Sequence, residues 1–344
     1  MNYSSPRGLR VERYDPDRRH AWDSFVANGK NATFLFQRGF LDYHSDRFVD
    51  HSLLIWRGGS LVGLLPANLK ADHTVVSHQG LTYGGFVLSR DATLHDTLEI
   101  VQATLGALEH AGIDILIYKR IPRHYEPLPS DEVDYAMFLL DAKLIRRDTA
   151  IVVPQDNSLP IRRGKRSQIS KGKRAGVRVV EEVEFATYWT QVLVPRLMSR
   201  YGVPPVHSLA EIELLASRFP GQIRQFSAYV GAQMAAGVTI FETRSVAHVQ
   251  YSAIHPNGEA VAALDVLMEW LISDVYKGKK SVDFGICNER EGRALNHGLL
   301  QSKEGFGARS VAHDFYEVHT ASHTKIEAVL LPIASPACGP TRVC

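Results

Sequence analysis

The order of hydrophobic and polar positions repeats itself in the two halves of the chain. Apolar stretches on either side of a glycine turn predict a β-hairpin twice, in SLLIWRGGSLVGLLPANL and in QFSAYVGAQMAAGVTIFE. In each half a further strand follows, and then a long helical stretch that leads into another strand: TLEIVQATLGALEHAGIDILIYKRI and AALDVLMEWLISDVYKGKKSVDFGIC. Corresponding landmarks lie between 166 and 174 positions apart: Gly63 and Gly237, His78 and His248, Gly112 and Gly278. The pattern therefore predicts a duplicated α+β unit.

The boundary between the two units is expected in the polar, proline-containing stretch 154–158. The first predicted unit covers residues 1–155 and the second covers residues 156–317. Each should be a mixed, mostly antiparallel sheet flanked by helices, and the second unit is expected to carry the active site. At a length of 344 residues, each unit is large enough to bury its own core.

The composition is that of an ordinary globular enzyme. Lys and Arg number 39 against 37 Asp and Glu, a net charge of +2, so the chain is not a generally basic polyanion binder. The N-terminus lacks the apolar region of a signal peptide, and no apolar run approaches the roughly 20 residues that span a bilayer. The cysteines Cys287, Cys338 and Cys344 form neither a metal spacing nor an even disulfide framework. These features predict a cytoplasmic protein and leave the role of the C-terminal cysteines open.

One segment departs from this balance. Eight Lys or Arg residues occupy the seventeen positions from Arg162 to Arg178, and no acid interrupts them. Ser158 is a plausible N-cap and Gly176 a plausible end for a helix. A solvated helix face is the default interpretation of such a run, but its place at the junction of two units favours phosphate binding. The absence of aromatics within it argues against base stacking. The candidate phosphate-binding residues are Arg162, Arg163, Lys165, Arg166, Lys171, Lys173 and Arg174.

Polar residues on two predicted strands of the second unit are the candidates for chemistry. In VDFGI the apolar Val282, Phe284 and Ile286 alternate with Asp283, which could orient or deprotonate an amine. In the stretch HVQYSA, His248 and Gln250 alternate with apolar positions and could line an acceptor cleft. His248 is a candidate base because the unperturbed pKa of a histidine is about 6.5. The alternative for each residue is a buried, hydrogen-bonded structural role.

The order hairpin, strand, helix, strand, helix, strand resembles the unit of the GNAT acyltransferases. Two such units in tandem, the second opening with a basic helix, resemble the FemAB-like branch of that superfamily. The residues that carry the resemblance are KRSQISKGKRAGVRV, VDFGICNE and LLQSKEGFGARSVAHDFYEV, and the resemblance covers about residues 10 to 320. It implies that residues 318–344 return to the first unit and end in a flexible tail.

The resemblance also implies an activity. Members transfer an acyl or aminoacyl group from acyl-CoA or aminoacyl-tRNA to an amine on a nucleotide-linked or lipid-linked precursor of the cell envelope, such as a surface polysaccharide. No tightly bound cofactor and no metal is then expected. The phosphate loop of single-domain GNAT enzymes, Arg/Gln-x-x-Gly-x-Gly/Ala, has no match here, because QSKEGFG is one residue longer. The choice between CoA and tRNA as donor stays open.

Two further residues are implicated by the resemblance alone. A lysine before a Gly-Phe-Gly-like turn in the family binds the donor or stabilises transition-state charge, which implies that role for Lys303. The alternative is an exposed lysine that complements a helix dipole. The family also places an acceptor-contacting tyrosine at the position of Tyr251, although alternation puts this side chain on the apolar face of its strand.

A different class of function also fits the sequence. A catalytically silent module that binds RNA or phosphate-linked glycan carriers could have kept the duplicated fold and its basic helix. The polar residues of the predicted cleft favour the enzyme. The sequence specifies neither the acyl group, nor the acceptor, nor the oligomeric state.

Overall fold

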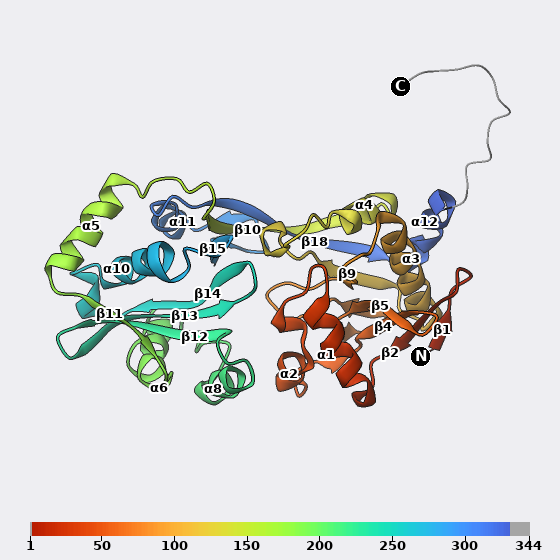
Figure 1. Cartoon of the computed structure of the whole chain (residues 1–344), viewed down its shortest axis with the longest axis horizontal. Coiled ribbons are helices and arrows are strands. Elements are labelled where there is room, and N and C mark those ends of the chain that lie inside the picture. Colours follow the sequence, from red (N-terminus) through yellow and green to blue (C-terminus); the bar gives the residue numbers. More distant parts are fainter. Residues whose placement is uncertain (1, 331–344) are drawn as a thin grey trace, which may run out of the picture.

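The computed structural model describes residues 2–330, which form two units lying side by side along the long axis (Figure 1). The first half of the chain supplies the strands β1 (Asn2–Ser4), β2 (Leu9–Arg13), β3 (Val49–Asp50), β4 (Leu53–Arg57), β5 (Ser60–Leu65), β6 (Asn68–Ala71), β7 (Thr74–Val76), β8 (Val87–Leu88), β9 (Ile115–Lys119) and β10 (Lys143–Pro154). Its α-helices are α1 (Arg19–Asn28), α2 (Arg38–Leu41), α3 (Leu94–His110) and α4 (Glu132–Leu139).

The second half supplies the remaining elements. Its strands are β11 (Arg178–Glu182), β12 (Ile223–Val230), β13 (Gln233–Glu242), β14 (Val246–Ile254), β15 (Ser281–Ile286), β16 (Asn288–Glu289), β17 (Ala294–Leu295) and β18 (Arg309–His319). Its α-helices are α5 (Arg163–Arg174), α6 (Ala186–Tyr188), α7 (Val194–Tyr201), α8 (Leu209–Arg218), α9 (Pro256–Glu259), α10 (Ala263–Trp270), α11 (His297–Glu304) and α12 (His323–Leu330). None of the helices within residues 2–330 is long and apolar enough to cross a membrane.

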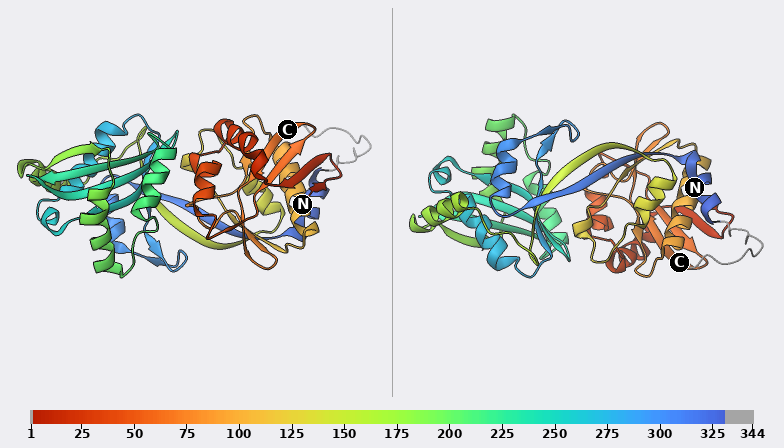
Figure 2. Two further views of the ribbon diagram at one scale, coloured as in Figure 1. Left: turned by 90° about the horizontal axis from the view of Figure 1, so that it is seen from below. Right: turned by 90° about the horizontal axis from the view of Figure 1, so that it is seen from above.

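One large sheet runs through both units. Its strand order is β11-β12-β13-β14-β15-β10-β18-β9-β7-β6-β3. The last strand of each half crosses to the other half, because β10 pairs with β15, β18 pairs with β9, and β10 and β18 pair with each other. Figure 2 shows these two long strands running together between the units. The hairpin β4–β5 lies in a separate sheet of order β1-β2-β4-β5-β8.

The two halves share a parallel strand pair joined by a helix. β7 pairs in parallel with β9 across α3, and β14 pairs in parallel with β15 across α10. The predicted α+β class, with mixed and mostly antiparallel strands flanked by helices, is confirmed. The correspondence between the halves differs from the predicted one at His78. Val76 pairs with Ile117 as His248 pairs with Asp283, so Val76 is the counterpart of His248, and His78 lies beyond the end of β7. The limits 1–155 and 156–317 stay a prediction.

The C-terminal segment packs on the first half as far as the structure describes it. The Thr320 hydroxyl donates to the Ile113 carbonyl over 2.7 Å, and His323 on α12 lies 2.9 Å from the Glu109 carboxylate on α3. Ile326 and Leu330 are buried in the core of the first unit. The remainder of the expected flexible tail, with Cys338 and Cys344, lies outside the described residues.

A second hydrophobic core joins the two units to each other. Phe34 and Phe40 of the first unit meet Phe219 and Phe241 of the second, with ring centroids 5.2 Å apart for Phe34–Phe219 and 6.0 Å apart for Phe40–Phe241. All four rings are buried. Aromatic pairs of this kind contribute about 0.5–1.5 kcal/mol beyond the burial of their surface. The relative position of the units is therefore fixed by packing.

The basic run forms α5, but two expectations about it are wrong. The helix begins at Arg163 with Arg162 as an N-cap that makes no side-chain bond, not at Ser158, because Pro160 disfavours helical backbone before it. The helix also lies at the outer end of the second unit and not at the junction (Figure 1), since β10 carries the chain across that unit first. Gly172 is explained by packing on α10, where a Cβ would lie 2.5 Å from Val266 Cγ2.

Candidate active site

A cleft of about 480 Å³ lies between the two units. Lys119 and Tyr125 line it from the first unit, and His248 and Asp283 line it from the second. Its floor is built from β10 and β18, the two strands that cross between the units. The candidate site thus draws on both halves of the chain, whereas the sequence pattern places it in the second half alone.

Asp283 and His248 form the centre of this cleft. The parallel register of β14 and β15 sets the two residues opposite each other, and His248 Nδ1 lies 3.0 Å from Asp283 Oδ2. Both side chains are buried. Since Nδ1 faces a carboxylate, the neutral imidazole donates its proton there and keeps its lone pair on Nε2. Nε2 is then free to accept a proton from a substrate.

The first unit holds this pair in place. The Tyr125 hydroxyl donates to Asp283 Oδ2 over 2.7 Å, and His124 Nε2 lies 3.4 Å from the same oxygen. The backbone N–H of Gly285 donates to Asp283 Oδ1 over 2.7 Å. Burial alone would raise the pKa of Asp283, but the imidazoles of His248 and His124 hold it well below its usual range. Asp283 is therefore an ionised, fully oriented carboxylate.

Tyr125 and His124 are functional candidates that the sequence does not reveal. They lie in a short 3₁₀ turn after β9, 158 positions before Asp283 in the case of Tyr125. No spacing rule links residues of two units. The available signal was a run of polar and aromatic residues, Arg123-His124-Tyr125, directly after a buried strand.

A β-bulge changes the expected faces of β14. Thr239 pairs with Tyr251 while the next residue, Ile240, pairs with Val249, so Gln250 is the extra residue. Strict alternation is broken there, and the expectation that Tyr251 faces away from His248 is wrong. Both residues lie on the face that packs toward the first unit. The Tyr251 hydroxyl lies 2.6 Å from His207 Nδ1, and burial raises its pKa to about 12.

The bulged residue itself faces open space. Gln250 lines the cleft and also an adjoining cavity of about 390 Å³. Its Oε1 is buried and has no hydrogen-bond partner among the described residues. Because a buried acceptor without a partner is unfavourable, Gln250 Oε1 is suited to a donor from a bound molecule.

Lys303 is buried, and the expectation of an exposed helix end is wrong. It lies in the last turn of α11, which begins at His297 after the N-cap Asn296. Its Nζ donates to the carbonyls of Gly285 and Ile286 over 3.0 and 2.8 Å, and burial lowers the pKa of Lys303 to about 8. These bonds fix the end of β15, two residues from Asp283.

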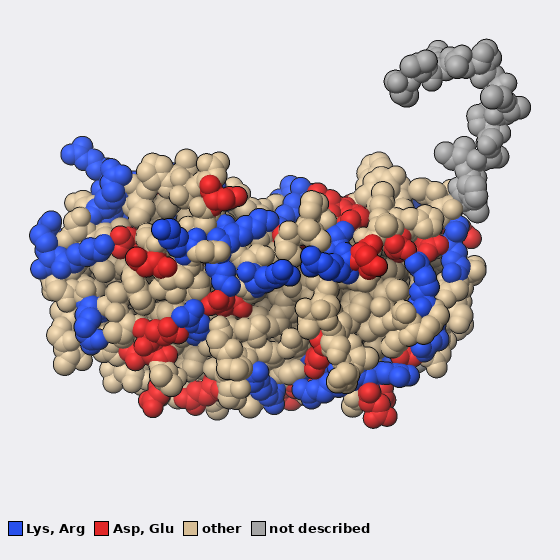
Figure 3. Space-filling view, in the orientation of Figure 1, with Lys and Arg blue, Asp and Glu red and all other residues tan. Residues whose placement is uncertain are grey.

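The basic residues of α5 divide into paired and unpaired groups. Ion pairs join Arg162 to Glu304 and Lys165 to Asp265 at the start of the helix, and Lys173 to Glu269 farther along. Figure 3 shows Lys and Arg side chains gathered where α5 lies in Figure 1. Among the described residues, four side chains of α5 make no ion pair: Arg163, Arg166, Lys171 and Arg174.

A second group of polar side chains lines the floor of the cleft. Lys119 Nζ donates to the carbonyls of His78 and Leu81, and burial lowers the pKa of Lys119 to about 7. Next to it, Arg146 on β10 makes a bidentate contact with Asp148 at 2.7–3.0 Å. The sequence pattern does not reveal these residues, because they belong to strands that meet only through the exchange between units.

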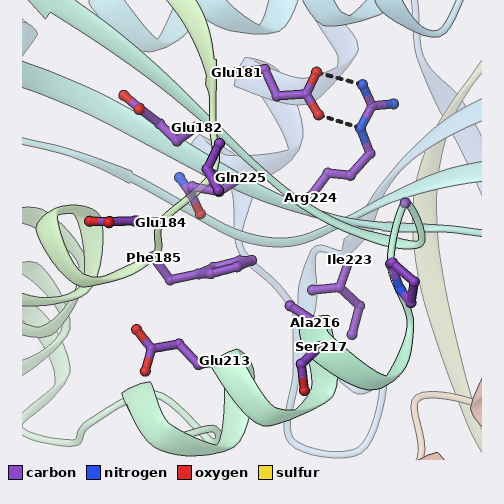
Figure 4. Close-up of a pocket in the computed structure, with 13 residues that line it drawn as sticks. Glu181, Glu182, Glu184, Phe185, Glu213, Ala216, Ser217, Ile223, Arg224 and Gln225 are labelled. Atoms are coloured by element: carbon purple, nitrogen blue, oxygen red, sulfur yellow. Dashed lines mark hydrogen bonds and ion pairs between the residues drawn. The ribbon is translucent and has the colours of Figure 1, made fainter.

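Another cavity, of about 700 Å³, lies away from this centre (Figure 4). Glu182, Glu184 and Glu213 stand around it, and Phe185 and Ile223 supply apolar walls. Arg224 is held by Glu181 through two bonds of 2.8 Å. Among the described residues that line it, there is no histidine and no unpaired cation, so these residues offer neither a base nor an anion site for acyl transfer.

The comparisons with known proteins agree with this architecture. Residues 161–292 match the family described as an acetyltransferase (GNAT) domain. The solved structure of FemX is similar at a TM-score of 0.65 and 9% identity, over 93% of this chain and 100% of FemX. L-PGS from Bacillus licheniformis is similar at 0.56 and 13%, over 93% and 98% of the two chains. The C-terminal domain of a protein from Agrobacterium fabrum assigned as a lysylphosphatidylglycerol synthetase gives 0.55 and 13%, over 91% and 94%.

No curated protein matches the sequence. The family match lies in the second half, which contains His248 and Asp283, and the structural similarity extends over both halves. Residues 161–292 therefore match an acetyltransferase (GNAT) domain, and the fold of the two halves together is similar to that of FemX.

Proposed function

We propose that the protein transfers an acyl or aminoacyl group to an amine on a cell-envelope sugar or peptide precursor, with His248 as the general base. The observation that carries the proposal is the His248–Asp283 pair in a cleft between the units, since its contact through Nδ1 leaves His248 Nε2 as the ring nitrogen available to a substrate. Amide formation from a thioester or ester needs a deprotonated amine, a stabilised oxyanion and a proton for the leaving group.

The proposed reaction assigns each proton to an atom. The acceptor amine donates one N–H to Gln250 Oε1, which has no other partner among the described residues. As the nitrogen attacks the donor carbonyl and the C–N bond forms, its proton moves to His248 Nε2. The ionised Asp283 stabilises the resulting imidazolium. When the carbon–sulfur or carbon–oxygen bond breaks, the imidazolium returns the proton to the leaving atom.

Lys303 and the first unit have positioning roles in this scheme. Lys303 holds two carbonyls at the end of β15 and thereby the backbone that follows Asp283. Tyr125 and His124 contact the oxygen of Asp283 that faces His248. Tyr251 anchors His207, which lines the cavity that adjoins the cleft.

The donor is proposed to be acyl-CoA or aminoacyl-tRNA, both of which carry phosphates. The unpaired cations of α5 support this proposal, since Arg binds phosphate bidentately and Lys as a point charge. The start of α5 also touches the turn that follows Lys303, where the Arg162 N–H donates to the Gly305 carbonyl over 2.8 Å. Both donors are cytoplasmic molecules, which supports a cytoplasmic site of action.

An aminoacyl donor is supported by one of the similar folds, since the name lysylphosphatidylglycerol synthetase denotes the formation of an aminoacylated lipid. An amine acceptor agrees with the GNAT domain and with the free Gln250 acceptor.

The test is donor-dependent product formation with the full chain. A panel of acyl-CoAs and aminoacyl-tRNAs would be incubated with amino-sugar nucleotides and peptide precursors, and products would be identified by mass spectrometry. His248→Gln should lower turnover by about 10²–10⁴. His95→Gln on the surface of α3 is the matched control, since His95 is 62% exposed and should change nothing. Phosphate-dependent binding without any product would favour the silent binding module instead.

A further inference from the structure

An apolar segment without a charged residue projects from the second unit. Between Arg200 and His207 the chain reads YGVPPV. Tyr201 is 56% exposed, Val203 55% and Val206 74%, and Met198 in the preceding turn of α7 is 48% exposed. Most exposed apolar residues of a folded protein are scattered singly, whereas these four fall within nine positions.

The fold itself holds this segment outward. α7 ends at Gly202, whose φ of 70° is accessible to glycine without strain. At the other end the His207 N–H donates to the Tyr251 hydroxyl over 3.1 Å, and the His207 carbonyl accepts from Trp189 Nε1 over 3.3 Å. The His207 end is therefore anchored on Trp189 and Tyr251, the other end is set by the turn at Gly202, and the apolar residues between them remain exposed.

The segment also borders the candidate active site. Val206 and His207 line the cavity of about 390 Å³ that adjoins the cleft at Gln250. Phe48 and Arg47 of the first unit line the same cavity. Anything that covers the exposed valines is thus placed at the entrance to the cleft.

We propose that Met198, Tyr201, Val203 and Val206, here called the apolar rim, dock the protein on the surface of a lipid bilayer. Two neighbouring prolines, Pro204 and Pro205, leave the segment few backbone donors for pairing with a protein strand. The Arg200 guanidinium lies 5.3 Å from the centre of the Tyr201 ring. Arg200 and Tyr201 thus place two side chains with an apolar body and a polar tip beside the valines. Such side chains favour the boundary between lipid and water.

The charges around the apolar rim are largely neutralised. Arg47 pairs with Glu211 over 2.6 Å and Arg196 pairs with Glu259 over 2.7 Å, while Asp46 is also exposed nearby. Insertion of apolar side chains, and not attraction to anionic headgroups, is therefore the driving force. Binding should be nearly as strong to neutral bilayers as to anionic ones. Docked in this way, the cleft entrance faces the bilayer, where a lipid-linked amine is presented.

The test uses sedimentation of the full chain with phosphatidylcholine vesicles and with vesicles that also contain phosphatidylglycerol. Wild-type protein should sediment with both. The double variant Val203→Asp/Val206→Asp should partition about tenfold more weakly, since it places charge in the docking surface. Val183→Asp is the matched control, because Val183 is 95% exposed but lies beside the acidic cavity in another part of the second unit. Melting temperatures of all three proteins confirm folding.

A second variant reports the depth of insertion directly. Val206→Trp should show quenching of its added fluorescence by lipids brominated near the headgroup. Absence of sedimentation with either vesicle, sedimentation with anionic vesicles alone, or equal sedimentation of the double variant would overturn the proposal. The assay contains no acyl donor, so its failure leaves the proposed acyl transfer intact.

Discussion

His248 on β14 and Asp283 on β15 lie side by side because these two strands run parallel, and their imidazole and carboxylate meet at 3.0 Å. The helix α10 that connects the strands carries the chain over one face of the sheet. A base and its orienting acid thus come from residues 35 positions apart in one βαβ connection. The stretch that matches the GNAT domain, residues 161–292, contains both residues.

Replacing the orienting acid tests this relationship. In Asp283→Asn the side-chain amide favours the other histidine tautomer, with the proton on Nε2, and the base is lost. We expect turnover to fall by about 10²–10⁴ with a smaller change in KM. Steady-state kinetics would measure the fall in turnover. Asp274→Asn, at an exposed position after α10, is the control. Full activity of Asp283→Asn would show that the pair is structural.

The contribution of the first unit can be tested at Tyr125. Tyr125→Phe removes one hydrogen bond to Asp283 and leaves the buried ring in place. We expect a loss of about tenfold in turnover, since a hydrogen bond to a charged group contributes about 1.5–3 kcal/mol. Tyr188→Phe, a buried tyrosine whose hydroxyl has no partner among the described residues, is the matched control. A loss confined to melting temperature would assign Tyr125 to stability only.

The sequence predicted the elements that depend on local pattern. Glycine turns, alternation and helical periodicity revealed the duplicated α+β order, and His248 and Asp283 followed from polar positions in apolar strands. The partners from the first unit could not be predicted, because β10 and β18 exchange between units and no local pattern encodes that exchange. The bulge at Gln250 was missed for a related reason: one extra residue reverses every face that alternation assigns beyond it.

Lys119 allows a test by pH. Its pKa falls from an ordinary value near 10.5 to about 7 on folding, so between these values the unfolded chain binds more protons than the folded one. The contribution of this group to stability therefore rises as pH increases from about 7 toward 10. In Lys119→Met, the increase in unfolding free energy over this pH range should be smaller than in the wild type by on the order of 2 kcal/mol. Denaturant titrations at several pH values measure it, and parallel curves for the two proteins would contradict the assignment.

The basic run is tested by removing the unpaired charges of α5. Replacing Arg163, Arg166, Lys171 and Arg174 with Gln leaves the three ion pairs of α5 intact. The affinity for the phosphate-bearing donor should fall by about tenfold at low ionic strength, since each exposed contact contributes about 0.2–1 kcal/mol. The difference should shrink as salt rises, because the screening length shortens. Calorimetric titration with the donor at two salt concentrations measures these affinities. Equal affinities of the variant and the wild type would show that the run is only a solvated face.

Substitutions of Lys303 distinguish a direct electrostatic role in catalysis from a positioning role. Lys303→Met keeps the length of the side chain but leaves the Gly285 and Ile286 carbonyls without their buried donor. If the lysine only positions β15, the unfolding free energy of Lys303→Met should fall by about 1–3 kcal/mol. Turnover should fall as well, because the Asp283 carboxylate is then held less firmly. If its charge also acts on the transition state, the wild-type enzyme should lose turnover above its lowered pKa of about 8, where the amine becomes neutral, while binding of the donor is retained. Lys303→Arg keeps the charge above that pH. Its turnover should then stay level from pH 7 to 9, and a decline parallel to that of the wild type would assign Lys303 to positioning alone.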